Sequence, residues 1–484
     1  MHSKLIVPAA VAVLSAVVAV SAAGGNLKSY EGASWYAKYL AVTAPATPLC
    51  DSNTGDVGQI SFPGSPVNVD ASHECGSQSE TSIAIDPSHP SNVIVGSNEI
   101  QRLPMRAMAS TDGGATFTGV DLPLPPPSTR QGSDFGSDPG VAFDSNGNAY
   151  YSYIIVFFAK GGAINGSEMA VARSSNHGLS WTATYFAPST GEAHFNDKPM
   201  ITVDSGSGPG HFHNRVYVAW DNAVGSSSSE KNGNNLVLSY SDDGGVTFTA
   251  PVSVSGNFIG KTGAIGADPY VASNGTLHVA WHDAARGQIF DASSTDGGVT
   301  FTAPHTIATV PEFQFNPVAQ AVRGALVYPA CGAAGSSLYC SYTAGTPGGV
   351  KVFVAKSTDG GVTWPTVKQM PAGGDQFNQW LAVDPSNGSV NVAYYDTQTK
   401  DAPATIYTLA RSTDGGASYA AQQVATSPTD ETGGAGVDLG NQYGDYEGIA
   451  ALNGTVRPVW TDRRQDVIDL GLREEVLTAS LTFP

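Results

Sequence analysis

Short runs of apolar residues separated by glycine-containing turns occur along most of the chain. Residues 268–281 are typical, because they read as two strands joined by the dipeptide Asn274-Gly275, which favours a two-residue hairpin turn. Similar Asn-Gly turns begin at Asn146, Asn387 and Asn453. The pattern predicts many short antiparallel strands joined by tight turns, and therefore an all-β fold.

An eight-residue block recurs after these strand pairs. Ser110-Thr-Asp112-Gly-Gly-Ala-Thr-Phe117 returns in four further close copies and in one degenerate copy at 174–181. The other close copies are 241–248, 294–301, 357–364 and 412–419. Successive copies are 53 to 67 residues apart, which is enough chain for one four-stranded sheet. The aspartate can accept hydrogen bonds from nearby backbone N–H groups, while the glycines allow positive φ in a tight turn.

This block resembles the Asp box, or BNR repeat, of the sialidase superfamily. The resemblance implies a β-propeller of four-stranded antiparallel blades, in which each box joins the third and fourth strands of a blade. It also implies that the boxes are structural and lie on the face away from the active site. We therefore assign no catalytic role to the box aspartates.

Innermost strands are more numerous than boxes and predict seven blades, with six as the alternative. They are expected to begin near Thr81, Pro139, Pro199, Pro269, Pro317, Trp380 and Gly448. The last unit has no box and supplies three strands, at 446–452, 456–460 and 475–481. A strand around 66–69 could supply its fourth strand and close the ring.

The N-terminal region predicts export. Residues 1–23 combine Lys4, an apolar stretch and small residues at the end, as in a secretory signal peptide, so the mature protein is expected to be secreted or periplasmic without a membrane span. Residues 24–75 form an extension that holds the closing strand, and residues 76–484 form the propeller. Four cysteines suggest two disulfides. Cys331 and Cys340 flank a turn-rich linker, which leaves Cys50 with Cys75.

Composition and charge narrow the class of partner. Glycine accounts for 56 of 484 residues and charged residues for 13%, so coiled coils, helix bundles and charge-rich disorder are disfavoured. The formal net charge of −19 would repel nucleic acid. We expect a monomer whose partner is a carbohydrate or glycoconjugate. No cofactor is required by the pattern, and calcium held by channel oxygens is left open.

Polar residues gather at the starts of first strands and the ends of second strands, which belong to the rim opposite the boxes. Aromatic residues and carboxylates recur together there, and such a rim suits a glycan. The simpler interpretation, that many of these aspartates cap strand ends and loops, applies to each one taken singly. The candidate ligands of the substrate on this rim are Asp197, His282, Asp283, Arg286, Asp462 and Arg463. Arg102 is a further candidate, because residues 101–104 resemble the Arg-Ile-Pro motif of the sialidase superfamily.

The resemblance implies a mechanism with a tyrosine nucleophile assisted by glutamate, an aspartate acid/base and three arginines that bind a sugar carboxylate. Tyr446 beside Glu447 is the best candidate for the nucleophile region, although neighbours along a strand point to opposite faces. Asp134 and Asp138 are the acid/base candidates. The leading hypothesis is a secreted exo-glycosidase that acts on a glycan end in the central pocket.

Two alternatives remain open at this stage. One is a non-catalytic propeller that binds glycans or proteins, because one scaffold supports many functions. The other is a polysaccharide lyase that uses histidines near charged residues. Its candidates are His194 with Asp197 and Lys198, and His282 with Asp283 and Arg286.

Overall fold

The computed structural model describes most of the chain after residue 60. The described residues are 61–72, 76–100, 104–125, 134–158, 164–189, 191, 195–223, 234–256, 263–371, 373–433, 440–464 and 474–483. The proposed signal peptide and the proposed Cys50–Cys75 disulfide lie outside them. Within the described residues no helix is both long enough and apolar enough to cross a membrane.

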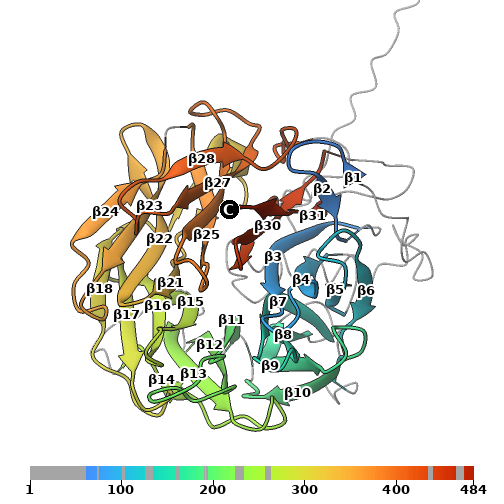
Figure 1. Ribbon diagram of the computed structural model, residues 1–484, viewed down its shortest axis with the longest axis vertical. Coiled ribbons are helices and arrows are strands. Elements are labelled where there is room, and N and C mark those ends of the chain that lie inside the picture. Colours follow the sequence, from blue (N-terminus) through green and yellow to red (C-terminus); the bar gives the residue numbers. More distant parts are fainter. Residues whose placement is uncertain are drawn as a thin grey trace, which may run out of the picture.

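Seven antiparallel sheets form a closed ring, so the protein is an all-β, seven-bladed propeller (Figure 1). Blades 1 to 3 follow one another along the chain. Blade 1 contains β3 (Gln78–Ile85), β4 (Val93–Glu99), β5 (Arg106–Ser110) and β6 (Thr118–Asp121). Blade 2 contains β7 (Asp134–Phe143), β8 (Ala149–Phe158), β9 (Ile164–Ser174) and β10 (Thr182–Phe186). Blade 3 contains β11 (Asn196–Val203), β12 (Val216–Ala223), β13 (Asn234–Ser241) and β14 (Val252–Ser253).

Blades 4 to 6 repeat this order. Blade 4 contains β15 (Ala264–Val271), β16 (Leu277–Asp283), β17 (Gln288–Ser294) and β18 (His305–Thr309). Blade 5 contains β21 (Ala330–Ala334), β22 (Ser337–Thr346), β23 (Gly349–Ser357) and β24 (Thr366–Gln369). Blade 6 contains β25 (Gln376–Val383), β26 (Val390–Asp396), β27 (Ile406–Ser412) and β28 (Ala420–Gln423).

Blade 7 is completed by a strand from the segment before blade 1, as the sequence predicted. β29 (Gly448–Leu452), β30 (Thr455–Asp462) and β31 (Glu475–Ala479) come from the C-terminal end, and β2 (Asn68–Asp70) pairs antiparallel with β31. The short strands β1 (Ser61–Phe62) and β32 (Leu481–Thr482) extend the same sheet. The pairing of β2 with β31 joins the two ends of the described chain within one blade and so closes the ring.

The expected start of blade 5 is wrong. Pro317 precedes a 3-10 turn, η3 (Val318–Gln320), and the innermost strand begins at Ala330. The intervening segment contains the small pair β19 (Gln314–Phe315) and β20 (Ala325–Leu326). In several other blades the innermost strand has a proline between polar and apolar residues near its start. Pro317 has similar neighbours in the sequence, although no innermost strand begins there. This excursion carries Arg323 to the axis of the ring, where it meets Asp445.

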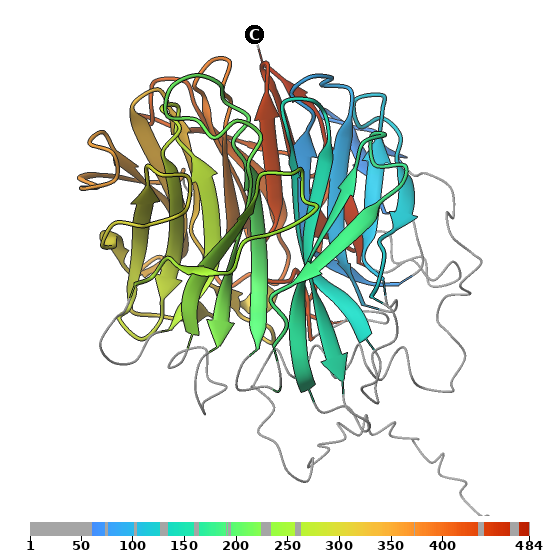
Figure 2. The same ribbon diagram turned by 90° about the horizontal axis from the view of Figure 1, so that it is seen from below.

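The core lies between neighbouring blades. Large side chains of second strands, such as Trp220, Trp281 and Trp460, are fully buried and pack against the sheet of the preceding blade. The blades stand side by side around the axis, with their strands running between two rims (Figure 2). Because adjacent strands are antiparallel, the starts of first strands share one rim with the ends of second strands, and the box turns lie on the other.

The box turns form as the sequence predicted. In the copy that begins at Ser357, the Asp359 carboxylate accepts hydrogen bonds from the Ser357 and Thr363 hydroxyls and from the Thr363 backbone N–H. Gly360 and Gly361 adopt φ of 74° and 87°. These local bonds lower the pKa of Asp359 to about 2, so this carboxylate stays ionised at all ordinary pH values. The predicted Cys331–Cys340 disulfide is present and links the two paired strands β21 and β22.

One buried amide links the closing strand to blade 6. Asn68 on β2 donates to the Val424 carbonyl of blade 6 at 2.9 Å, and its oxygen accepts from the Thr426 N–H and from Arg464. We expect Asn68→Ala to lower the free energy of unfolding by about 1–3 kcal/mol, because it removes the partner of the buried Val424 carbonyl and of the part-buried Thr426 and Arg464 donors. The exposed control Asn316→Ala should change it by less than about 0.5 kcal/mol. Urea unfolding checks this, and equal stabilities of the two variants would show that the Asn68 side chain does not stabilise the ring.

Candidate functional site

Five innermost strands carry a β-bulge at the same height. In each case the pairing with the second strand shifts register, and the residue at the bulge has positive φ. The bulge residues are Glu80 (54°), Asp138 (60°), Lys198 (54°), Gly266 (69°) and Asn378 (46°). Positive φ is unfavourable for residues other than glycine, and persists where the surroundings hold it. A repeated bulge also redirects side chains, which here places charged groups from different blades together.

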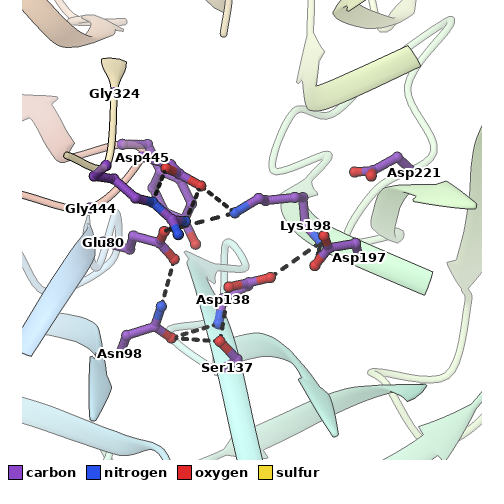
Figure 3. A network of polar contacts seen from close by, with 12 residues as sticks. Glu80, Asn98, Ser137, Asp138, Asp197, Lys198, Asp221, Gly324, Gly444 and Asp445 are labelled. Carbon is purple, nitrogen blue, oxygen red and sulfur yellow. Dashed lines mark hydrogen bonds and ion pairs between the residues drawn. The ribbon is translucent and has the colours of Figure 1, made fainter. Parts of the chain in front are cut away.

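The charged bulge residues meet two groups from the connections between blades (Figure 3). The Lys198 ammonium lies 2.6 Å from Asp445 Oδ2 and 3.7 Å from Glu80 Oε1. Arg323, from the excursion before blade 5, binds both oxygens of Asp445, with Nε 2.8 Å from Oδ1 and Nη2 2.7 Å from Oδ2. Its Nη2 also lies 3.3 Å from Glu80 Oε1. We call Glu80, Asp138, Lys198, Arg323 and Asp445 the axial cluster.

Asn98 on β4 positions two acids of the axial cluster. Its amide nitrogen donates to Glu80 Oε2 at 2.5 Å. Its oxygen accepts from the Asp138 backbone N–H at 2.7 Å and from the Ser137 hydroxyl at 3.1 Å. Ser137 also donates to Asp138 Oδ1. Glu80 and Asp138 are therefore oriented by one side chain that joins blades 1 and 2.

The connection into blade 7 approaches Glu80 closely. Gly444 has φ of 75°, and a Cβ at this position would lie 2.5 Å from Glu80 Cγ. The Gly444 carbonyl accepts hydrogen bonds from Gln320 at 2.6 Å and from Asn378 at 3.0 Å. Only glycine combines this backbone conformation with this approach. The two amides thereby fix the connection that delivers Asp445.

The two acids joined by Asn98 have opposite pKa shifts. Burial, together with the nearby Asp445 and Asp138 carboxylates, raises the pKa of Glu80 to about 8 against the attraction of Lys198 and Arg323. Burial also acts on Asp138, but the Lys198 charge and hydrogen bonds from Asp197, Glu80 and Ser137 outweigh it and lower the pKa. At neutral pH Glu80 therefore holds a proton, whereas Asp138 is ionised.

The remaining charges of the axial cluster are stabilised by one another. Burial opposes the ionised form of Asp445, but Arg323 and Lys198 hold its pKa well below the usual range. The Asp445 and Glu80 carboxyls raise the pKa of Lys198 well above its usual value despite burial. The side chains of Glu80, Lys198 and Asp445 are at most 2% exposed. In this low-dielectric setting each ion depends on its partners.

Aromatic rings border the axial cluster. Tyr446 packs 5.9 Å from Trp380, and its hydroxyl donates to the Pro139 carbonyl. The Tyr328 ring lies 6.0 Å from the Lys198 ammonium and against Gly266, where a Cβ would be 2.1 Å from the ring. Burial, with Glu80 and Asp138 nearby, raises the pKa of Tyr446 well above its usual value, so this phenol keeps its proton.

The structure separates the candidates Tyr446 and Glu447. Glu447 accepts hydrogen bonds from Tyr395 at 2.5 Å, from the Thr461 N–H at 3.0 Å and from the Thr81 hydroxyl, between blades 6, 7 and 1. Burial raises the pKa of Glu447 to about 7. Tyr446 instead faces the axial cluster.

Among the other candidates, Asp138 belongs to the axial cluster and Asp197 adjoins it, accepting a hydrogen bond from the Lys198 N–H at 3.0 Å.

The remaining candidates have partners outside the axial cluster. Arg286 pairs with Asp283 at 2.6 Å at the end of β16, and the buried His282 binds the Val310 carbonyl. Arg463 donates to the Asp430 and Gly433 carbonyls, while Asp462 pairs with Arg464. Asp134 is the first residue of β7. Arg102 and His194 lie outside the described residues.

Sequence reasoning did not single out Glu80, Arg323 and Asp445 as site residues. A signal existed for Glu80, because Glu80, Asp138 and Lys198 each lie six residues before an aspartate that ends the innermost strand. Those aspartates are Asp86, Asp144 and Asp204, each of which accepts hydrogen bonds within the following turn. Arg323 had no such signal, since it belongs to an irregular excursion. Within the described ranges no group of three or more His, Cys, Asp or Glu residues is placed to hold a metal ion.

No protein-family model and no curated protein matches this chain. Solved structures similar to it include a protein of unknown function from Dyadobacter fermentans, at 13% identity, with 73% of this chain and 96% of that chain covered and a TM-score of 0.47. An α-L-arabinofuranosidase from Fusarium graminearum has 11% identity, coverages of 72% and 93%, and a TM-score of 0.44. The NanB sialidase from Streptococcus pneumoniae has 12% identity, coverages of 88% and 70%, and a TM-score of 0.43.

The raised pKa of Glu80 predicts a specific dependence of stability on pH. Between about pH 4.5 and pH 8 the unfolded chain has lost the Glu80 proton while the folded protein keeps it, so this residue makes stability fall as pH rises. In Glu80→Gln that contribution is absent, and the variant should gain stability relative to the wild type from pH 5 to pH 8. Urea unfolding at several pH values measures the difference.

Asp359→Asn is the matched control, because Asp359 does not titrate in that interval. Its stability should follow the wild-type pH dependence. A constant difference between Glu80→Gln and the wild type would mean that Glu80 is ionised at pH 7.

Proposed function

We propose that this protein is an exported carbohydrate-active enzyme, an exo-glycosidase that acts on the end of a glycan at the axis of the propeller. The observation that carries the proposal is the pair formed by Glu80 and Asp138, two carboxyl groups from neighbouring blades with opposite pKa shifts. Glycoside hydrolysis commonly requires one protonated and one ionised carboxyl group at neutral pH. Pairs of acids whose pKa values are driven apart also cluster at functional sites.

In this proposal Glu80 donates the proton to the departing glycosidic oxygen. Asp138, kept ionised by Lys198, serves as the base or stabilises positive charge that develops on the sugar. Asn98 fixes the relative orientation of the two groups. Tyr446 keeps its proton and acts as part of the wall, packed against Trp380, rather than as a nucleophile.

Export is proposed from the signal-like residues 1–23 and supported by the disulfide. A bond between Cys331 and Cys340 persists in an oxidising compartment, which is where secreted and periplasmic proteins fold. A carbohydrate-active enzyme of this kind would meet glycans outside the cell.

The ion pairs of Asp445 with Arg323 and Lys198 favour a second function, which is binding without catalysis. Both oxygens of Asp445 are bound, and the axial cluster is almost fully enclosed, which would also suit a structural core for a propeller that binds glycans or proteins without catalysis. Activity separates the two functions, because a structural cluster predicts no turnover at any concentration of substrate.

The enzyme proposal predicts release of fluorophore from at least one aryl glycoside in a panel that covers common hexoses, pentoses and sialic acid. Glu80→Gln and Asp138→Asn should each lower kcat by at least about 100-fold while the far-UV spectrum is unchanged, because each removes one proton-transfer group. Asp359→Asn, in a box turn, should leave kcat within about twofold. Loss of the Glu80 proton should make the rate fall as pH rises through about 8.

Absence of turnover with every glycoside, from protein that is folded, would contradict the enzyme proposal and support the binding function. Full activity of Glu80→Gln would contradict the assigned role of Glu80 even if turnover is found.

A further inference from the structure

The two cations of the axial cluster already have a carboxylate between them. Arg323 binds Asp445 in a bidentate manner, and the Lys198 ammonium contacts the same Oδ2 atom. Bidentate guanidinium–carboxylate pairing is among the strongest polar contacts in proteins. All three side chains are at most 3% exposed, so water does not compete for these contacts. Asp445 thus occupies the place that a carboxylate of an acidic ligand would need.

The charges of the axial cluster leave no excess for a second anion. Lys198 and Arg323 contribute two positive charges, Asp445 with Asp138 contributes two negative charges while Glu80 is protonated, and the buried Asp197 carboxyl adjoins Asp138 as a further acid. A sugar carboxylate that entered here would have to displace Asp445 from both cations or lie beside Asp138. Like charges forced together in a desolvated site cost several kcal/mol. The electrostatic balance therefore selects against acidic sugars.

We propose that the axial site takes an uncharged sugar end, and that Asp445 is a specificity-determining residue which excludes sialic and uronic acids by occupying Arg323 and Lys198 itself. The substrate part of this inference rests on the proposed function. The claim that Asp445 excludes carboxylates depends only on the charges of the axial cluster, so the binding of a small carboxylate can test it without turnover.

Matched pairs of sugars test the substrate class in the wild-type protein. A galactoside and a galacturonide differ only in a neutral CH2OH group against a carboxylate, and glucoside with glucuronide form a second pair. For the pair whose ring is accepted, kcat/KM should be at least about 100-fold higher for the neutral member. An aryl sialoside should be cleaved no faster than a uronide. Preference for the acidic member, or efficient cleavage of the sialoside, would overturn the inference.

Removal of Asp445 tests the exclusion without any turnover. Asp445→Ala leaves Arg323 and Lys198 without their shared carboxylate, so added acetate should bind and raise Tm by at least about 2 °C, whereas sodium chloride at equal ionic strength should not. The wild-type Tm should stay within about 1 °C under the same additions. Asp445→Ser, whose shorter side chain also vacates the position of the carboxylate, is the second variant and should show the same response if Asp445→Ala does not fold without acetate.

The outcomes of these experiments are distinct. If folded wild-type protein cleaves no glycoside, the proposed function fails and the substrate claim fails with it, while the acetate response still decides whether Asp445 fills an anion site. If neither variant responds to acetate, or if the wild type is stabilised as strongly as the variants, Asp445 does not exclude carboxylates and the inference is wrong.

Discussion

Charges that are buried together must balance, and this constraint governs the centre of the propeller. Moving an isolated ion out of water into a protein interior is unfavourable by several kcal/mol, and only oppositely charged partners with good geometry compensate for it. In the axial cluster Asp445 lies between Arg323 and Lys198, and that pairing allows Asp138 to remain ionised and leaves Glu80 protonated. The chemistry available at the axis follows from this balance rather than from any single residue.

The propeller fold brings the balancing charges together at the axis, because several blades and the connections between them each contribute one or two charged side chains. Bulges at the same height turn Glu80, Asp138 and Lys198 toward one another, although these residues are far apart in the sequence. Closure of the ring by β2 and β31 places the connection into blade 7 beside blade 1, so that Asp445 reaches Lys198 across the axis. Without closure the partners of each buried ion would separate, which links the stability of the ring to the ionisation of its centre.

The regular part of the fold follows from the sequence because it depends on local interactions. The block that begins at Ser357 closes its own turn, with Asp359 bonded to Thr363, and the Asn-Gly dipeptides make short hairpins without help from distant residues. The closing strand was also predictable, since three C-terminal strands without a fourth require a partner. The Cys331–Cys340 pair followed from its short linker for the same reason.

The site was only partly predictable, because its contacts are long-range. Asp138 was named from its place before a first strand, but its partner Glu80 was not selected, and Asn98, which joins them, lies on a second strand. Arg323 reaches the axis through an irregular excursion that the sequence suggested was a strand. Its contacts with Asp445 span more than a hundred residues, and no periodic pattern encodes them.

The central claim is that the balance of buried charges keeps Glu80 protonated beside an ionised Asp138. The most direct measurement is the carboxyl 13C chemical shift of Glu80 as a function of pH, in protein labelled at glutamate side-chain carboxyls and assigned by comparison with Glu80→Gln. The account predicts a resonance that titrates near pH 8. Titration near pH 4.5, the value of an ordinary glutamate, would contradict it.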